Sequence, residues 1–410
     1  MALYCFFTEY LSDLCEEYGP TFIDSILESY PARIFRRLRR RAASPPANHQ
    51  KKVMMLWLPD ELLWKICMDV VTLETLWCPT HGSNCPRIPK RLSAIANLSA
   101  TCRRFRELIG PSYTQVINVR GAWCRTARSI RTIAESHFAR ECTTSLKIQP
   151  YLGPGKGWKP PRHLPSNLAT GIMSLSMLSS LTLNMPEYRT SVFQRAFERR
   201  EFSLPKLDTL VLGPHMEWII RMCPNVQIIS TAGFGWLHSD VDGDYSRRHS
   251  TELIRAAGKA EKLKHFEMHE FWERRFLWAI RAAMPRLSSF AMPGGRYNQG
   301  LTELLPVLKR FKCLKTLALS DVVNLDVGFY PPGCGNAYLE PGGDEYLKSI
   351  QSRARGVSET VASLVLTEME CLEAVWIGNS FRAVPVRNAS GAIYDVALSH
   401  ERRQNLGHDY

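Results

Sequence analysis

Apolar residues recur along most of the chain in one short pattern, Leu-x-x-Leu-x-Leu, with any apolar residue at the Leu positions. The second half of the pattern alternates apolar residues with others, which is typical of a β-strand that buries one face. Six copies begin at Leu178, Leu207, Leu263, Leu287, Leu314 and Leu372, with a degenerate copy at Val226-x-x-Ile229 and earlier copies at Thr114-x-x-Ile117-x-Val119 and Thr143-x-x-Leu146-x-Ile148. The pattern predicts a short strand at each copy and leaves the exact number of repeats open.

The spacing of these copies is irregular. From Leu178 onward, successive starts differ by 29, 19, 37, 24, 27 and 58 residues. Leucine-rich repeats have this signature and a period of about 20–29 residues. The last interval is either two periods or one period with an insertion.

Helical periodicity fills the intervals between the predicted strands. The expected helices span Val192–Phe202, Met216–Met222, Thr251–Ala260, Phe276–Met284, Leu301–Phe311 and Glu359–Met369. A strand and a helix in each repeat predict an irregular leucine-rich-repeat α/β solenoid, a horseshoe, over residues 112–380. We expect a Gly/Pro-rich loop insertion near 327–344 and a polar, partly disordered C-terminal tail over 381–410.

The N-terminal part of the chain has a different sequence pattern, without the strand repeats. Residues 1–32 predict a short helical segment, and residues 33–53 predict a basic, proline-containing linker. Residues 54–111 predict a small all-α unit of three short helices. We expect Pro59 in the first turn of its first helix, where a missing N–H is tolerated, and Gly110-Pro111 predicts the end of its last helix.

Two motifs in this small unit resemble the F-box family. The first is Leu58-Pro59-x-Glu61-Leu62-x-x-x-Ile66, and the second is Leu98-Ser99-x-Thr101-Cys102-Arg103-Arg104-Phe105-Arg106-x-Leu108. The chain departs from the family in a long insertion from about Thr72 to Pro89. Many F-box proteins carry leucine-rich repeats after the box, as the repeat pattern predicts here.

The resemblance implies a function without catalysis. An F-box binds a Skp-type adaptor and through it a cullin, so that the repeats present a protein substrate to an SCF-type ubiquitin ligase. The residues that the resemblance assigns to adaptor binding or to the box's own core are Leu58, Pro59, Leu62, Leu63, Ile66, Leu98, Cys102, Phe105 and Leu108. The alternative is a non-ligase repeat scaffold for protein–protein interaction, in which the box-like helices only cap the end of the solenoid.

Composition and charge limit the kinds of partner and the compartment expected for the chain. The chain has 52 Lys and Arg against 39 Asp and Glu, a net charge of +13. One basic tract, Arg33–Arg41, is either a nuclear-import signal or a solvated linker, and the remaining excess is spread thinly, which disfavours nucleic acid as a partner. The uncharged stretch Leu164–Met185 is too polar to cross a membrane. Twelve cysteines without a Cys-x-x-Cys motif, and an N-terminus unlike a secretory signal, predict a reduced protein in the cytoplasm, the nucleus or both.

Catalytic and metal-binding motifs are absent from the sequence. It contains no phosphate-binding loop, no Gly-x-Ser-x-Gly and no His-Glu-x-x-His. Cys78, His81 and Cys85 provide three potential zinc ligands with a spacing that matches no common finger, and Gly153–Gly157 predicts a surface turn. We therefore expect no enzyme activity, no cofactor and no metal.

The strand pattern also predicts which residues face the open side of the sheet. Alternation places one row outward: Thr182, Asn184, Val211, His265, Glu267, His269, Ala291, Thr316, Ala318, Ser320 and Trp376. Most are small or polar, whereas His265, Glu267, His269 and Trp376 offer charge, hydrogen bonds and a large ring. We expect these four to bind the substrate. Trp218, Trp236, Trp272 and Trp278 are expected in the core.

Overall fold

The computed structural model divides the chain into two compact units, Met1–Gly110 and Pro111–Tyr410. The structure describes residues 60, 103–150, 159–186, 189–231, 243–269, 272–293, 299–330, 343–388, 390, 393–401 and 403. The predicted segments 1–32 and 33–53, most of the box-like unit, Cys78, His81, Cys85, Gly153–Gly157 and Trp236 lie outside the described residues.

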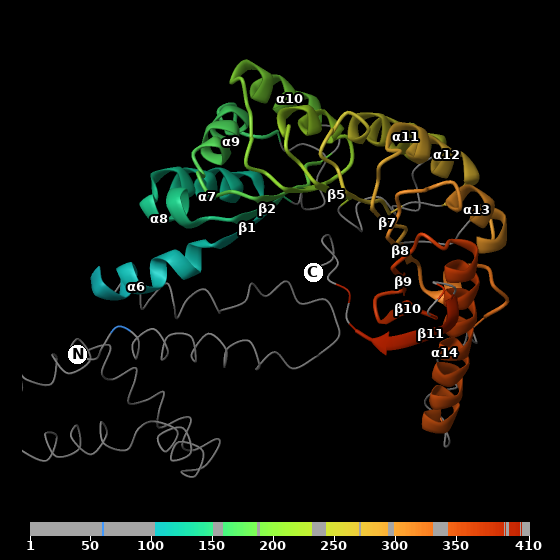
Figure 1. Ribbon diagram of the computed structural model, residues 1–410. Coiled ribbons are helices and arrows are strands. Elements are labelled where there is room, and N and C mark those ends of the chain that lie inside the picture. The colour runs from blue at the N-terminus through green and yellow to red at the C-terminus, as the bar shows by residue number, and fades with distance from the viewer. Residues whose placement is uncertain are drawn as a thin grey trace, which may run out of the picture. The chain divides into compact units, whose positions relative to one another are not determined.

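The second unit is a mixed α/β structure built on one open sheet of eleven strands, whose order in space is their order along the chain (Figure 1). Strands β1 to β9 are parallel, and β10 and β11 are antiparallel to their neighbours. The strands are β1 Val116–Gly121, β2 Ser145–Pro150, β3 Ser180–Leu183, β4 Thr209–Leu212, β5 Ile228–Thr231, β6 His265–Glu267, β7 Ser289–Ala291, β8 Thr316–Leu319, β9 Ala374–Ile377, β10 Phe381–Arg387 and β11 Ile393–His400.

All nine predicted strands are present, and their register repeats the sequence pattern. The middle apolar position of one copy lies opposite that of the next, as Leu181 does with Leu210 and Phe266 with Phe290. These side chains are fully buried. The apolar residues at the middle position of successive strands therefore form a continuous ladder through the core.

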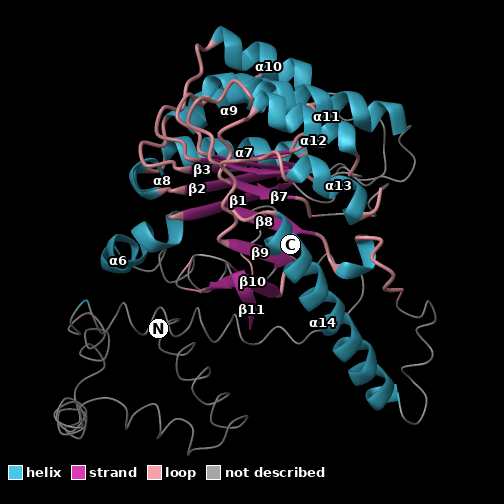
Figure 2. Cartoon of the chain, turned by 45° about the vertical axis from the view of Figure 1, so that its right-hand side comes forward, coloured by secondary structure: helices cyan, strands magenta, loops and turns pink. Residues whose placement is uncertain are grey.

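Helices follow most of the parallel strands and cover one side of the sheet (Figures 1 and 2). They are α7 Trp123–Glu135, α8 His137–Cys142, α9 Leu164–Met173, α10 Thr190–Arg199, α11 Gly243–Ala257, α12 Arg274–Ala283, α13 Leu301–Leu308 and α14 Gly343–Glu368, with the 3-10 helices η4 Glu217–Met222 and η6 Val322–Asn324. Helix α6, Arg103–Thr114, precedes β1 and continues through Gly110-Pro111, so the helix end predicted there was wrong. The predicted alternation of strand and helix is thus confirmed, although the predicted helix 216–222 is a 3-10 helix. No described helix is both long and apolar enough to cross a membrane.

The long interval before β9, the last parallel strand, contains a single strand-and-helix unit with an insertion. Strand β8 pairs directly with β9, as Leu317 does with Val375, so no further strand lies between them. The insertion contains α14, a helix of 26 residues whose described buried side chains lie mostly in its second half. Within the predicted loop, irregular backbone is described from Val327 to Tyr330, and α14 begins at Gly343, one residue before the end predicted for that loop.

The predicted polar tail was wrong for residues 381–400, which form the antiparallel hairpin of β10 and β11. Ala383 is fully buried, and Phe381, Val396 and Leu398 pack against the core. Pro385 is compatible with a strand here because β9 pairs only with Phe381–Ala383, so Pro385 has a strand neighbour on one side alone.

Two of the predicted core tryptophans are buried, and one is not. Trp218 and Trp272 have exposed fractions of 8% and 0%, whereas Trp278 is 37% exposed. The guanidinium groups of Arg310 and Arg281 lie 4.8 and 5.6 Å from the Trp278 ring centroid. The core expectation was wrong for Trp278 because its helix, α12, directs it towards solvent, where arginines cover the ring.

Candidate functional site

The candidate site is built around Glu267, at the end of β6 on the sheet face opposite the helices. Register places Glu267 in a row with the corresponding residues of the other parallel strands. From β3 to β9 this row is Thr182, Val211, Ser230, Glu267, Ala291, Ala318 and Trp376. Glu267 is the one charged residue in that list, and its neighbours on β7 and β8 are alanines.

The open surface predicted for this row was wrong at most positions. Thr182, Val211, Glu267, His269, Ala291, Ala318 and Ser320 have exposed fractions of 5% or less. His265 and Trp376 are half-buried. Alternation along a strand determines which face a side chain takes, but it does not determine whether another part of the chain covers that face.

Arg403 is the described residue that binds Glu267. Its Nη2 donates a hydrogen bond of 2.6 Å to Oε2 of Glu267, across 136 residues of sequence. The side chains are 9% and 0% exposed. The backbone N–H of Arg403 donates to the carbonyl of Asn379, and that of Glu401 donates to Ser380, so the chain beyond β11 runs beside the β9–β10 turn.

Two imidazoles flank the carboxylate and are oriented by hydroxyl groups on adjacent strands. Nε2 of His265 lies 3.7 Å from Oε2 of Glu267, and Nδ1 of His265 lies 2.7 Å from Oγ of Ser289 on β7. Nδ1 of His269 lies 3.1 Å from Oγ1 of Thr231 on β5, and this hydroxyl also accepts a hydrogen bond from the His269 N–H. Both rings are therefore oriented by hydroxyl groups of the neighbouring strands.

The charges of the site favour an ionised carboxylate. Burial alone raises the pKa of Glu267, but the contact with His265 and the charges of Arg403 and the two histidines lower it to about 2. Its Oε1 accepts no hydrogen bond from any residue that the structure describes. The site thus holds a buried negative charge that requires a cationic partner.

Trp376, the fourth predicted binding residue, lies on β9, three strands from Glu267. It faces Arg382 of β10 directly across the antiparallel pair, and the Arg382 guanidinium lies 5.9 Å from the ring centroid. The structure therefore places His265, Glu267 and His269 together and Trp376 farther along the same row.

Of the residues assigned to the adaptor, the structure describes only the α6 part. Phe105 and Leu108 lie on α6, and the Leu108 side chain is half-buried. On the same helix, Arg104 forms an ion pair of 2.6 Å with Asp60, a residue of the predicted first helix. The other assigned residues lie outside the described ranges: Leu58, Pro59, Leu62, Leu63, Ile66, Leu98 and Cys102.

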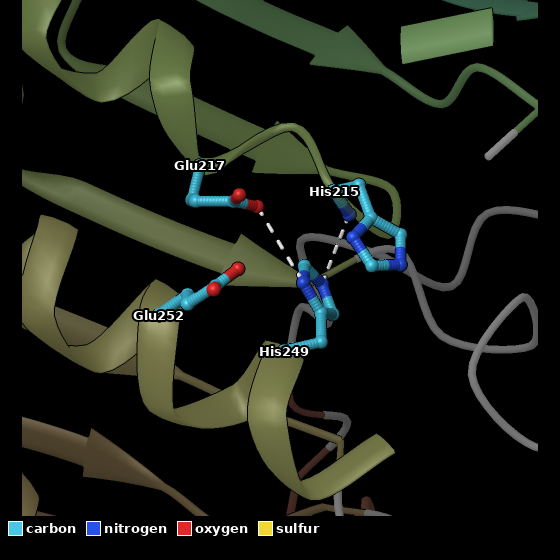
Figure 3. Close-up of side chains that lie close together, drawn as sticks. All are labelled: His215, Glu217, His249 and Glu252. Carbon is cyan, nitrogen blue, oxygen red and sulfur yellow. Dashed lines mark hydrogen bonds and ion pairs between the residues drawn. The ribbon is translucent and has the colours of Figure 1, made fainter. Parts of the chain in front are cut away.

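A second cluster of ionisable groups was not foreseen from the sequence. His215 and Glu217 at the start of η4 meet His249 and Glu252 on α11 (Figure 3), with one potential ligand atom from each within 4.8 Å of the others. His215 has a left-handed backbone, with φ of 57°, which is uncommon outside glycine. The one sequence signal is His249-x-x-Glu252, a spacing that places both residues on one face of a helix.

The hydrogen bonds of this cluster decide how it can be used. The His215 backbone N–H donates to Nε2 of His249 at 3.0 Å, so Nε2 carries a lone pair, and the neutral ring holds its proton on Nδ1. That nitrogen faces Oε2 of Glu217 at 3.5 Å. Nδ1 could ligate a metal only if the His215 hydrogen bond were broken, so the described arrangement rests on that hydrogen bond and on the approach of His249 to Glu217.

Comparison with known proteins identifies no family. No model of a known protein family matches the chain, and no curated protein matches it in sequence.

Proposed function

We propose that this chain is the substrate-recognition subunit of an SCF-type ubiquitin ligase. Residues 54–111 would be the F-box that binds the Skp-type adaptor, and the second unit would be an irregular leucine-rich-repeat solenoid that binds the protein substrate. In this proposal the chain performs no catalysis, and its effect is to raise the concentration of substrate near the ubiquitin carrier.

One observation carries the proposal: the two F-box-like motifs precede a ladder of nine parallel strands, and the second motif adjoins it. The second motif continues into α6, and β1 begins two residues after that helix ends. Each pattern copy supplies one strand, as stacked repeats require. In this proposal the substrate contacts are made where the sheet face remains partly exposed, at His265 beside Glu267 and at Trp376.

The adaptor contact can be tested with a pull-down of the full chain by a Skp-type adaptor. Leu62→Asp should abolish capture, because the aspartate places a charge on a stripe that the resemblance buries against the adaptor. The Leu58→Ala/Pro59→Ala double variant should weaken it. Leu347→Asp is the matched control, since Leu347 is 39% exposed on α14 and should not affect capture.

The scaffold alternative predicts a different result. If the box-like helices only cap the solenoid, the wild-type chain is not captured, and Leu62→Asp lowers the melting temperature instead. Capture that is equal for the wild type and Leu62→Asp would show that the adaptor map is wrong.

A further inference from the structure

The ion pair between Glu267 and Arg403 is unusual because nothing in the coil architecture requires it. A buried pair of charges is seldom a source of net stability, since desolvation of both ions offsets their attraction. Every other position of the row from β3 to β8 manages with a small or apolar neutral residue, such as Val211 or Ala318. The acid on β6 is therefore better explained by what it binds than by packing.

The surroundings of Glu267 suit a guanidinium group. The carboxylate is the acceptor, and the two imidazoles beside it are held by Ser289 and Thr231 rather than by the ligand. Oε1 still has capacity for a second hydrogen bond. A planar guanidinium can donate to both carboxylate oxygens and is only weakly hydrated, whereas an ammonium is a compact and strongly hydrated charge.

The present occupant of the site comes from the end of the C-terminal hairpin. Arg403 follows the last strand, and its described backbone bond is the one to the Asn379 carbonyl. Between the β9–β10 turn and β6 the row carries Trp376 on β9 and then the small residues Ala318 and Ala291. The arginine thus enters the site along the sheet face from the C-terminal hairpin, as an arginine of another protein could.

We propose that Glu267, with His265 and His269, is a recognition site for an arginine side chain of the protein substrate, and that Arg403 occupies this site when no substrate is bound. The inference rests on the proposed role of the solenoid as a substrate receptor and specifies the chemistry that it reads. A tethered arginine competes at an effective concentration in the millimolar range. Substrate binding therefore requires displacement of Arg403, and loss of Arg403 should strengthen it.

The test is a titration of the full chain with two short peptides, acetyl-Gly-Arg-Gly-Arg-Gly-amide and its lysine counterpart, followed by calorimetry. Arg403→Ala should bind the arginine peptide at least tenfold more tightly than the wild type and should prefer it to the lysine peptide. Adding Glu267→Gln to Arg403→Ala should abolish the gain. Arg355→Ala, at an exposed arginine of α14 that pairs with Glu359, is the control and should leave binding at the wild-type level.

Other outcomes would overturn the inference. If Arg403→Ala lowers the melting temperature without any gain in peptide binding, the pair is a structural bridge. Equal binding of both peptides would rule out arginine recognition. Should Arg403→Ala fail to fold, Arg403→Lys provides the same comparison with the charge retained. The titration contains no adaptor, so its failure leaves the proposed ligase role to the pull-down, and a failed pull-down leaves the arginine site intact.

Discussion

His249 shows how a single buried ring couples the fold to pH. Burial, together with the nearby His215, lowers the pKa of His249 from its usual 6.5 to about 3. Between these two values the unfolded chain binds a proton at this position and the folded chain does not. Acid therefore favours the unfolded state, with a slope of up to about 1.4 kcal/mol per pH unit from this residue.

We predict that His249→Gln flattens the dependence of stability on pH. The free energy of unfolding, measured by chemical denaturation at several values between pH 6.5 and 4.5, should fall less steeply in the variant than in the wild type. Glu267 does not interfere, because its contribution is lost only as the pH falls from about 4.5 towards 2. His137→Gln, at a ring that is 65% exposed on α8, should keep the wild-type slope; equal slopes for all three proteins would contradict the prediction.

The residues of the site differ in how far the sequence could predict them. Alternation along β6 placed His265, Glu267 and His269 on one face, where they are found. It could not reveal Arg403, because a contact across 136 residues leaves no periodic signal. His215 and His249 were missed for the same reason, since they come together only when η4 packs beside α11.

At the scale of elements, two glycines differ in their surroundings: one is closely packed between helices, and the other lies in an open part of a helix. Gly258 follows α11, and a Cβ there would lie 2.8 Å from Cβ of Ala283 and 2.9 Å from its carbonyl oxygen. Gly356 lies within α14, and a Cβ there would meet no atom within 4 Å. The same substitution should therefore have opposite effects at the two positions.

We predict that Gly258→Ala lowers the free energy of unfolding by about 1–3 kcal/mol, because α11 and α12 must move apart to accommodate the methyl group. Gly356→Ala should raise it by about 0.5–1 kcal/mol, because alanine loses less entropy in a helix. Chemical denaturation of both variants beside the wild type measures the two shifts. A destabilised Gly356→Ala would show that α14 packs against something at this turn.

The elements themselves were predicted where one pattern repeats and missed where it does not. In the nine parallel strands, apolar residues stack on their counterparts in the next strand. The same apolar pattern must therefore recur in the sequence of each strand, and this recurrence made the strands predictable. The hairpin of β10 and β11 occurs once, contains Pro385 and pairs in the opposite direction. Its stability comes from packing against β9 and α14, which a local reading of residues 381–400 cannot show.

For the whole molecule, the hairpin closes the C-terminal end of the sheet. Without it, β9 would present unpaired backbone groups beside the apolar Val375 and Ile377, which is a template for association with another chain. We predict that deletion of residues 381–410 produces self-association, detected as larger species in light scattering. Deletion of 404–410 alone should leave the protein in its original state. A monomeric 381–410 deletion would show that β9 needs no cover.

The pairing of every strand with its neighbour in the chain has a consequence for the order of folding. Paired residues are 19 apart between β4 and β5, as in Thr209 and Ile228, and 58 apart between β8 and β9, as in Leu317 and Val375. Closing the longer loop costs about 1 kcal/mol more in chain entropy. Folding can therefore begin among the central strands that short connections join, such as β4 and β5, and proceed outwards. The pairing of β9 with β8 is then the slow step. Arg403 follows β9 in the chain. Its ion pair with Glu267 can therefore form only after β9 has paired with β8.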